Sequence, residues 1–274
     1  MKATRLSPHL GFPTPDAPLF DALVAGIDPI DHVAFIADRG FGGVVDPFTM
    51  MRDPASQRAI GDAAARRGLH MGGFLYAPFD AIGRARWASC DSAVQAMVLG
   101  DVRAALDAAQ RLGARQIAIL SLAEPGEDEP EQLASMIDLL RRAGDLALAA
   151  GVELCVEGVN RARLPQMLLH GVARSAALVE RTDHPAVRLL FDTGHAAATG
   201  EDCAAMLEAH FPLVAAIQIA DHPGRVETGG GAIDLNAFFA TAERLGFVGQ
   251  YELEHRWSEP GQSAQRRFLD RLER

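Results

Sequence analysis

The sequence predicts a single closed (β/α)8 barrel, and two observations support that prediction. Short apolar runs alternate with longer segments rich in Ala, Leu and Arg along the whole chain, which is typical of strand–helix units around a parallel sheet. The length of 274 residues suits a barrel, which usually needs about 250, and no segment has the composition of a linker. We therefore expect residues 1–274 to form one domain.

The predicted strands are short and apolar, as expected where both faces of a parallel sheet are buried. They cover residues 6–11, 43–46, 69–76, 116–121, 153–157, 188–192, 215–220 and 250–254. The predicted helices lie between and after them, and a glycine follows many of these helices because glycine enters the left-handed conformation without steric cost. These helices cover residues 31–39, 54–67, 94–112, 129–150, 164–181, 202–209, 235–245 and 263–273.

A doubly wound open sheet is the competing fold. It is disfavoured because no GxGxxG follows the first strand and no Gly-rich phosphate loop occupies a strand–helix junction. Two junctions are longer than is usual in α/β units, at residues 77–92 and 221–234. Because both follow strands, we expect them to act as lids over a site at the carboxyl end of the barrel.

The composition restricts the classes of partner and chemistry. With 26 basic and 36 acidic residues the net charge is −10, which argues against nucleic acid and anionic membranes as partners. Lys2 is the one lysine, so Schiff-base and phosphate-loop lysine chemistry are disfavoured. The three cysteines form no CxxC pair, and no segment has the apolar length of a signal sequence or membrane span. We expect a soluble, cytoplasmic protein, and the sequence leaves open whether it forms a homo-oligomer.

Polar residues lie at the ends of four consecutive predicted strands. Glu157 and Asp192 end the fifth and sixth, Gln218 interrupts the seventh, and the eighth offers Glu252 and Glu254. Active sites of such barrels lie at the carboxyl ends of the strands, so these side chains should converge. Carboxylates gathered there would repel one another without a cation, and oxygen ligands favour Mg²⁺ or Mn²⁺ over zinc. Each residue alone has a plainer explanation, since a strand-end Asp often caps a helix and a buried Gln often satisfies backbone groups.

Two further residues are candidates for contacting a substrate. His195 follows Asp192 by three residues, where the chain leaves the sixth strand, so a role beside the metal or on a substrate oxygen is favoured over a structural one. Arg225 lies in the HPGR segment after the seventh strand, where its guanidinium could bind a carboxylate through two hydrogen bonds. Its plainer explanation is a solvated loop arginine.

The segments ELCVEGVN, LLFDTGHA, IQIADHPGRVETGGGAID and YELEH together resemble the xylose isomerase-like barrels of sugar isomerases and epimerases, and among them the hydroxypyruvate isomerases. The third segment is the most specific, since it largely reproduces the family pattern QIAD-x-PGR-x-E-x-G-x-G-E-[IL]-[ND]. The resemblance covers roughly residues 150–255. In the N-terminal half only the order of strands and helices matches.

The resemblance implies roles for individual residues. Its implied metal ligands are Glu157, Asp192, Gln218 and Glu254, with Glu157 and Glu254 also forming the proton-transfer pair. His195 and Arg225 correspond to substrate contacts, and Glu227 to a loop carboxylate beside them. The chain departs from the family pattern at a few positions, which leaves substrate preference open and makes Glu252 an alternative to Glu254 as ligand: Ala216, His222, Thr228, Ala232 and Glu252.

These features together predict a metal-dependent isomerase that acts on a small hydroxycarbonyl acid or sugar through an enediolate, with hydroxypyruvate and tartronate semialdehyde as the model pair. A ketose 3-epimerase, or an inosose-type isomerase or dehydratase acting on a larger keto-sugar, is the alternative. A metal-dependent endonuclease of the same barrel class is disfavoured by the acidic charge and by the few strand-end histidines. The non-enzymatic alternative is a sugar-binding barrel.

Overall fold

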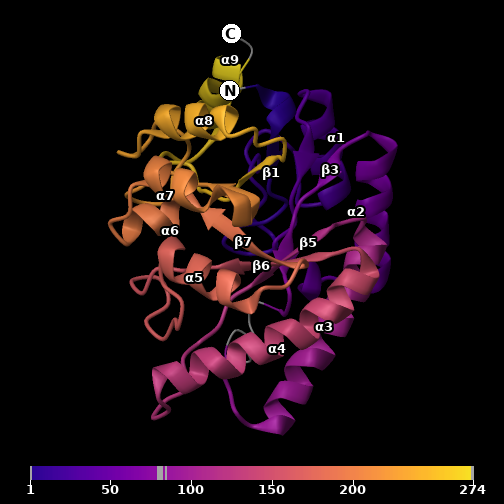
Figure 1. Cartoon of the computed structure of the whole chain (residues 1–274). Helices are drawn as coiled ribbons and strands as arrows, with labels where there is room; N and C mark the ends of the chain where they lie inside the picture. Colours follow the sequence, from indigo (N-terminus) through magenta and orange to yellow (C-terminus); the bar gives the residue numbers. More distant parts are fainter. Residues whose placement is uncertain (1, 79–82, 84, 273–274) are drawn as a thin grey trace.

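Parallel strands surrounded by helices make up the computed structural model, which describes residues 2–78, 83 and 85–272 (Figure 1). Seven strands form one sheet in the order β1-β9-β8-β7-β6-β5-β4, and β2 pairs with β3 in a second sheet. All of these pairings are parallel. The strands are β1 Leu6–Pro8, β2 Gly43–Val44, β3 His70–Met71, β4 Phe74–Leu75, β5 Gln116–Ile119, β6 Glu153–Glu157, β7 Val187–Asp192, β8 Val214–Ile219 and β9 Tyr251–Leu253.

Backbone hydrogen bonds around β2 close the barrel. The Leu10 N–H donates to the carbonyl of Val45 at 2.8 Å, and the Val45 N–H donates to the carbonyl of Pro8 at 3.0 Å, which joins the first strand to the second. On the other side of β2, the Gly72 N–H donates to the carbonyl of Val44 at 2.8 Å. The predicted (β/α)8 barrel is confirmed.

Aspartates begin most of the helices and fix their positions around the barrel. The side chains of Asp28, Asp53, Asp91, Asp202 and Asp234 each accept a hydrogen bond from a backbone N–H of the first helical turn, as expected at N-caps. The helices are α1 Pro29–Asp38, α2 Pro54–Arg66, α3 Ser92–Leu112, α4 Glu129–Ala150, α5 Val172–Thr182, α6 Thr193–Ala198, α7 Cys203–His210, α8 Leu235–Arg244 and α9 Gln262–Leu272.

Three local predictions were wrong. The third strand, predicted as one run over 69–76, is interrupted at Gly72 and Gly73 between β3 and β4. The helix predicted from residue 164 begins only at Val172, because the preceding segment forms turns and Met167 pairs with the backbone of Leu122. The short helix α6 was not predicted, since it directly follows a strand whose last residue, Asp192, is its N-cap.

Alternation of side chains along the strands separates the main core from the barrel interior. On β6, Leu154 and Val156 belong to the large apolar core shared with the helices, whereas Cys155 belongs to a small separate cluster with Ala118, Leu190 and Ala216. Glu157 has the same parity as Cys155 and therefore points into the barrel at its carboxyl end. No helix within the described ranges is long and apolar enough to cross a membrane.

Candidate active site and metal centre

The carboxyl ends of β6 to β9 bring four predicted site residues together inside the barrel mouth. Glu157 is 8% exposed, Asp192 is 2% exposed and Gln218 is 6% exposed. Backbone register pairs Asp192 with Gln218 across β7 and β8. Glu254, just past the end of β9, donates its backbone N–H to the carbonyl of Ile219 at 3.2 Å, so it stays beside β8.

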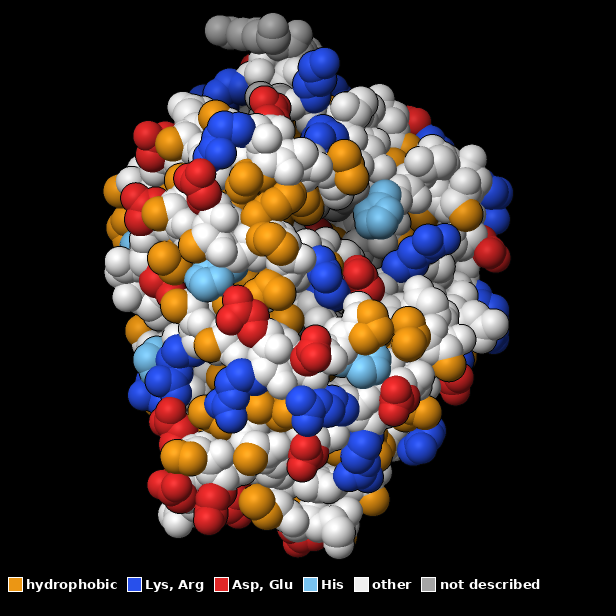
Figure 2. Space-filling model, viewed as in Figure 1, with side chains coloured by type: hydrophobic (Ala, Val, Ile, Leu, Met, Phe, Trp, Pro, Cys, Tyr) orange, Lys and Arg blue, Asp and Glu red, His pale blue; other side chains and the backbone are white. Residues whose placement is uncertain are grey.

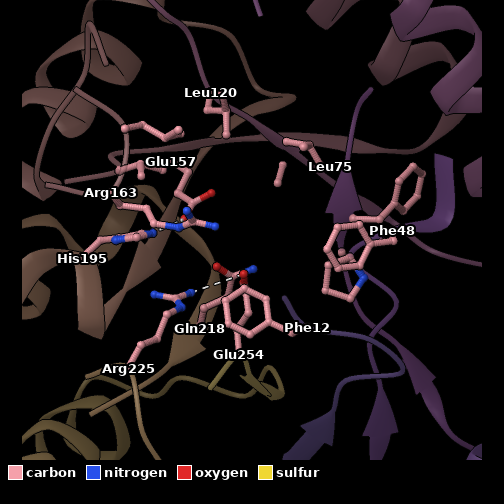
Figure 3. Close-up of a pocket in the computed structure, with 16 residues that line it drawn as sticks. Phe12, Phe48, Leu75, Leu120, Glu157, Arg163, His195, Gln218, Arg225 and Glu254 are labelled. Atoms are coloured by element: carbon pink, nitrogen blue, oxygen red, sulfur yellow. Dashed lines mark ion pairs between the residues drawn. The ribbon is translucent and has the colours of Figure 1, made fainter. Parts of the chain in front are cut away.

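Glu157, Gln218 and Glu254 line a cavity of about 70 Å³, and Asp192 lies just beside it, bound to the lining residue Arg225. His195 and Arg225 lie on the same polar side (Figure 3). Apolar side chains from β1 to β5 and the segments that follow them make up most of the remaining lining, among them Phe12, Phe48, Leu75 and Leu120. An apolar wall excludes water, which strengthens electrostatic interactions on the polar side.

Three of the polar side chains are close enough to share a cation. One ligand atom from each of Glu157, Asp192 and His195 lies within 4.8 Å of the others. The amide oxygen of Gln218 is buried and has no hydrogen-bond partner among the described residues. An orphaned buried acceptor beside carboxylates is what an oxygen-ligated Mg²⁺ or Mn²⁺ requires, so these residues fit such an ion.

Arg225 supplies a permanent cation to the same carboxylates. Its Nη2 lies 2.7 Å from Asp192 Oδ2 and its Nη1 lies 3.1 Å from Asp192 Oδ1, a two-bond contact. The same Nη2 lies 3.3 Å from Glu254 Oε1, and the guanidinium stacks 5.2 Å from the ring centre of Phe12. The expected repulsion among the carboxylates is therefore partly relieved by Arg225. Carboxylate oxygens carry further lone pairs, so Asp192 can still accept a metal.

Burial and charge separate the proton affinities of the three carboxyl groups. Burial, with the charges of Glu254 and Asp192, raises the pKa of Glu157 well above its usual value. Burial raises the pKa of Glu254 to about 7, although Arg225 opposes the shift. Burial also opposes ionisation of Asp192, but the charge and hydrogen bonds of Arg225 and His195 together outweigh it and lower the pKa of this group. Carboxyl groups with divergent pKa values are typical of acid–base catalysis.

Asn160 orients His195, and it was not among the predicted site residues. The Asn160 side-chain oxygen accepts the Arg163 N–H at 2.9 Å, so its NH₂ group points to Nδ1 of His195 at 2.7 Å. The proton of the imidazole then lies on Nε2, which is 3.5 Å from Glu157 Oε1. Burial lowers the pKa of His195 to about 4, so the ring is neutral at pH 7. Asn160 stands in the segment ELCVEGVN, which could have indicated it.

Hydrogen bonds hold Glu227 and the rest of the 221–234 segment in place beside the cavity, to which this segment contributes Arg225. The Glu227 carboxylate accepts hydrogen bonds from the N–H and the hydroxyl of Ser258, both at 2.7 Å, so it holds two loops together and does not line the cavity. The buried Asp221 carboxylate accepts three backbone N–H groups of its own segment, from His222, Gly229 and Ile233. The other predicted lid, residues 77–92, includes residues 79–82 and 84, which lie outside the described residues.

Glu252, the alternative ligand of the eighth strand, lies outside the cavity lining and is 3% exposed. Its Oε1 accepts the Gly73 N–H at 2.6 Å, and its Oε2 accepts the Gln218 amide at 3.3 Å. Glu254 lines the cavity instead. This placement favours Glu254 as the residue that faces a bound ligand.

His9 gives the stability of the chain a specific pH dependence. It is 2% exposed, and burial lowers its pKa from 6.5 to about 3. Between these values the unfolded chain binds the additional proton, so the free energy of unfolding falls as pH falls. His9's contribution is fully present above about pH 6.5, and up to about 2 kcal/mol is lost by pH 5, at about 1.4 kcal/mol per pH unit. Urea unfolding at pH 7.5 and pH 5 should show a smaller loss in His9→Gln than in the unmodified chain.

The comparison between the two chains is necessary because Glu157 and Glu254 titrate in the opposite sense. Their raised pKa values make the folded state bind more protons than the unfolded state, so they favour folding at lower pH. Only the difference in pH dependence between the variant and the unmodified chain isolates the imidazole. Equal losses on acidification would contradict this account of His9.

Figure 2 shows acidic and basic side chains interspersed over one face of the molecule, which presents no continuous basic surface in that view. A nucleic-acid-binding face would carry clustered Lys and Arg.

Comparison with known proteins agrees with the barrel fold. The chain is 26% identical over 228 residues to a 2-oxo-tetronate isomerase of Cupriavidus necator, which covers 83% of this chain and 86% of that protein. It is 24% identical over 156 residues to the hydroxypyruvate isomerase of Escherichia coli, and this match spans 57% of the chain and 60% of that protein.

A solved structure named as a family 2 AP endonuclease of Brucella melitensis is similar to this chain with a TM-score of 0.81 at 22% identity, over 97% of this chain and 98% of that structure's chain. At this sequence identity, the similarity shows a shared fold and no shared activity. The family model described as xylose isomerase-like TIM barrel matches residues 33–272. The chain therefore belongs to the xylose isomerase-like TIM barrel family.

Proposed function

We propose that this protein is a divalent-metal-dependent isomerase of a small hydroxycarbonyl acid, with hydroxypyruvate and tartronate semialdehyde as the model pair. The observation that carries the proposal is the convergence of Glu157, Glu254 and Arg225 on one cavity. Two protonatable carboxyl groups and a buried cation are the parts that moving a proton between adjacent carbons of an anionic substrate requires. The relatives named as hydroxypyruvate and 2-oxo-tetronate isomerases support the substrate class.

Glu157 and Glu254 would transfer the proton. One removes it from the carbon beside the substrate carbonyl, and the other delivers a proton to the neighbouring carbon. Glu254, with a pKa of about 7, can take either protonation state near neutral pH, and burial raises the pKa of Glu157 in the same direction. The reverse reaction exchanges the two roles.

Arg225 and His195 would hold the substrate. The guanidinium has five N–H donors, and its contacts with Asp192 and Glu254 leave donors for a substrate carboxylate. The neutral His195, protonated on Nε2, can donate to a substrate oxygen as negative charge builds on it. The apolar wall across the cavity keeps water from the reacting carbons.

The ligands proposed for the metal are Glu157, Asp192, Gln218 and Glu254, and Mg²⁺ or Mn²⁺ is the ion that their oxygens favour. When bound, the ion would supply an electrophile that stabilises the enediolate charge. His195, whose Nδ1 accepts from Asn160 and whose Nε2 carries the proton, would lie beside the ligands without binding the ion. Glu227, which binds Ser258, would support the loop beside the cavity rather than the substrate.

The size of the cavity favours a short substrate. Its volume is about 70 Å³. A cavity needs roughly 10–15 Å³ of such space to hold one water, so this space is of the scale of a short acid. A ketohexose or an inosose, the larger substrates of the alternative epimerase function, would require the surrounding loops to move.

A substrate panel tests the proposal. Hydroxypyruvate, tetronates, ketohexoses and inososes would each be incubated with the protein and Mg²⁺ or Mn²⁺ in deuterated water, and exchange of the substrate C–H followed by NMR. We expect exchange with the short acids. Exchange confined to ketohexoses or inososes would favour the epimerase alternative, and exchange with none would contradict enediolate chemistry altogether.

A further inference from the structure

The Glu252 carboxyl group lies beneath the cavity, in a space next to the interruption of the third strand. It is a nearly fully buried carboxyl group that makes two hydrogen bonds, one from a backbone N–H and one from the Gln218 side chain. A buried carboxylate is costly unless its oxygens are satisfied, and here each oxygen accepts one donor.

The interruption of the third strand at Gly72 and Gly73 makes room for the Glu252 carboxyl group. A Cβ atom on Gly72 would lie 2.6 Å from Oε1 of Glu252 and 2.9 Å from Cβ of Val45, which leaves no room for a side chain. The Gly73 N–H, freed from the regular strand, donates to the same Oε1 at 2.6 Å. The break between β3 and β4 therefore coincides with the position of one side chain from β9.

The hydrogen bond to Gln218 determines which end of that amide faces the cavity. An amide has one carbonyl oxygen and one NH₂ group on opposite sides. Because the NH₂ group donates inward to Oε2 of Glu252, the carbonyl oxygen must point away from Glu252, and it has no partner among the described residues. Gln218 lines the cavity.

We propose that Glu252 is a positioning residue, which holds the NH₂ group of Gln218 inward so that its carbonyl oxygen faces the cavity. The inference rests on the metal site of the proposed function, where that oxygen would serve as a ligand. Partners that orient a metal ligand typically affect metal affinity 10- to 100-fold when they are changed. A merely structural Glu252 would affect the stability of the barrel without affecting the orientation of this amide.

Glu252→Gln is a sharp test because it keeps the shape and removes one acceptor. Two donors, the Gly73 N–H and the Gln218 NH₂, face residue 252, and a carboxylate accepts both whereas an amide has a single oxygen. The backbone N–H cannot turn, so it should take that oxygen. The NH₂ group of the new side chain then faces Gln218, whose amide must turn and present its own NH₂ group to the cavity.

Mn²⁺ affinity, measured by calorimetric titration, is the first readout. We expect Glu252→Gln to bind Mn²⁺ about 10- to 100-fold more weakly. Glu153→Gln is the matched control, since Glu153 accepts the Gln116 amide at 3.4 Å in a similar pair at the other end of the barrel, and its affinity should not change. In the double variant Glu252→Gln/Gln218→Glu, the new carboxylate can accept from residue 252 and still offer an oxygen outward. The double variant should bind Mn²⁺ more tightly than Glu252→Gln. This gain in affinity should exceed the gain that Gln218→Glu alone gives in the unmodified chain.

The side-chain NH₂ resonances of Gln218, observed by ¹⁵N NMR without metal, are the second readout. In the unmodified chain they should be slow to exchange with solvent, and in Glu252→Gln this protection should be lost. Unchanged protection together with unchanged Mn²⁺ affinity in Glu252→Gln would overturn the inference. Protection that depends on Glu252 in a chain with no Mn²⁺ affinity would support the positioning role and contradict the metal site of the proposed function.

Discussion

Glu157→Gln is expected to lower kcat for the isomerised substrate by a factor of about 10²–10⁴, the usual contribution of a general acid or base. The pKa of Glu157 is raised well above its usual value, because the group is buried beside Glu254 and Asp192. The amide keeps the volume and one ligand oxygen of the carboxylate but cannot carry the proton. Steady-state kinetics should therefore show a large loss in kcat while Mn²⁺ binding is partly retained.

The matched control is Glu153→Gln, on the same strand at the opposite end of the barrel. Glu153 lies 4.0 Å from Arg188 and belongs to no part of the cavity, so this variant should keep its kcat. A Glu157→Gln protein whose activity stays within about tenfold of the unmodified chain would remove Glu157 from the proton-transfer pair, because an essential general base contributes more than that.

Arg225→Met is expected to destabilise the metal-free protein by about 3–5 kcal/mol, the usual effect of removing one partner of a buried ion pair. The substitution leaves the Asp192 carboxylate, 2% exposed, without its two-bond partner and removes the neighbouring cation from Glu254. Added Mn²⁺ should recover part of the loss, because it supplies positive charge to the same oxygens. Urea unfolding with and without Mn²⁺ measures both effects.

A surface arginine separates this effect from the loss of any ion pair. Arg267 pairs with Glu259 at 2.7 Å, but both side chains are more than half exposed, so Arg267→Met should cost less than about 1 kcal/mol and respond to Mn²⁺ as the unmodified chain does. Arg225→Met should also raise KM for an anionic substrate more than Arg267→Met does. Equal stability of the two variants would show that Arg225 is not the counter-cation of the carboxylates.

The strand-end residues could be predicted from the sequence because parity and strand direction determine their positions. Once a run such as Val-Glu-Leu-Cys-Val-Glu is recognised as a parallel strand, its last Glu must reach the carboxyl edge, and period-two alternation orients it with Cys155. The same logic applies to Asp192 and Gln218. It left open the choice between Glu252 and Glu254, since both share one parity and only their depth in the barrel differs.

Contacts between distant segments could not be predicted in this way. The bond between Asn160 and His195 joins the segment after β6 to helix α6, and the bond of Glu227 to Ser258 joins residues that are 31 positions apart. The interruption at Gly72 and Gly73 depends on a carboxylate 179 residues away in the chain. Local propensity does not report contacts between distant segments. The sequence alone therefore could not show whether Glu227 contacts a substrate or binds a neighbouring loop.

The permanent charge of Arg225 has a consequence for how folding would depend on an ion at the proposed metal site. In small domains whose ligands repel or lack partners until the ion arrives, removing the ion unfolds the chain. Here the Arg225 guanidinium already bridges Asp192 and Glu254, so the barrel can fold before any ion binds. At the proposed metal site, a chelator is then expected to abolish activity without unfolding the protein. Activity should depend reversibly on the free concentration of the ion, because the metal-free protein stays folded.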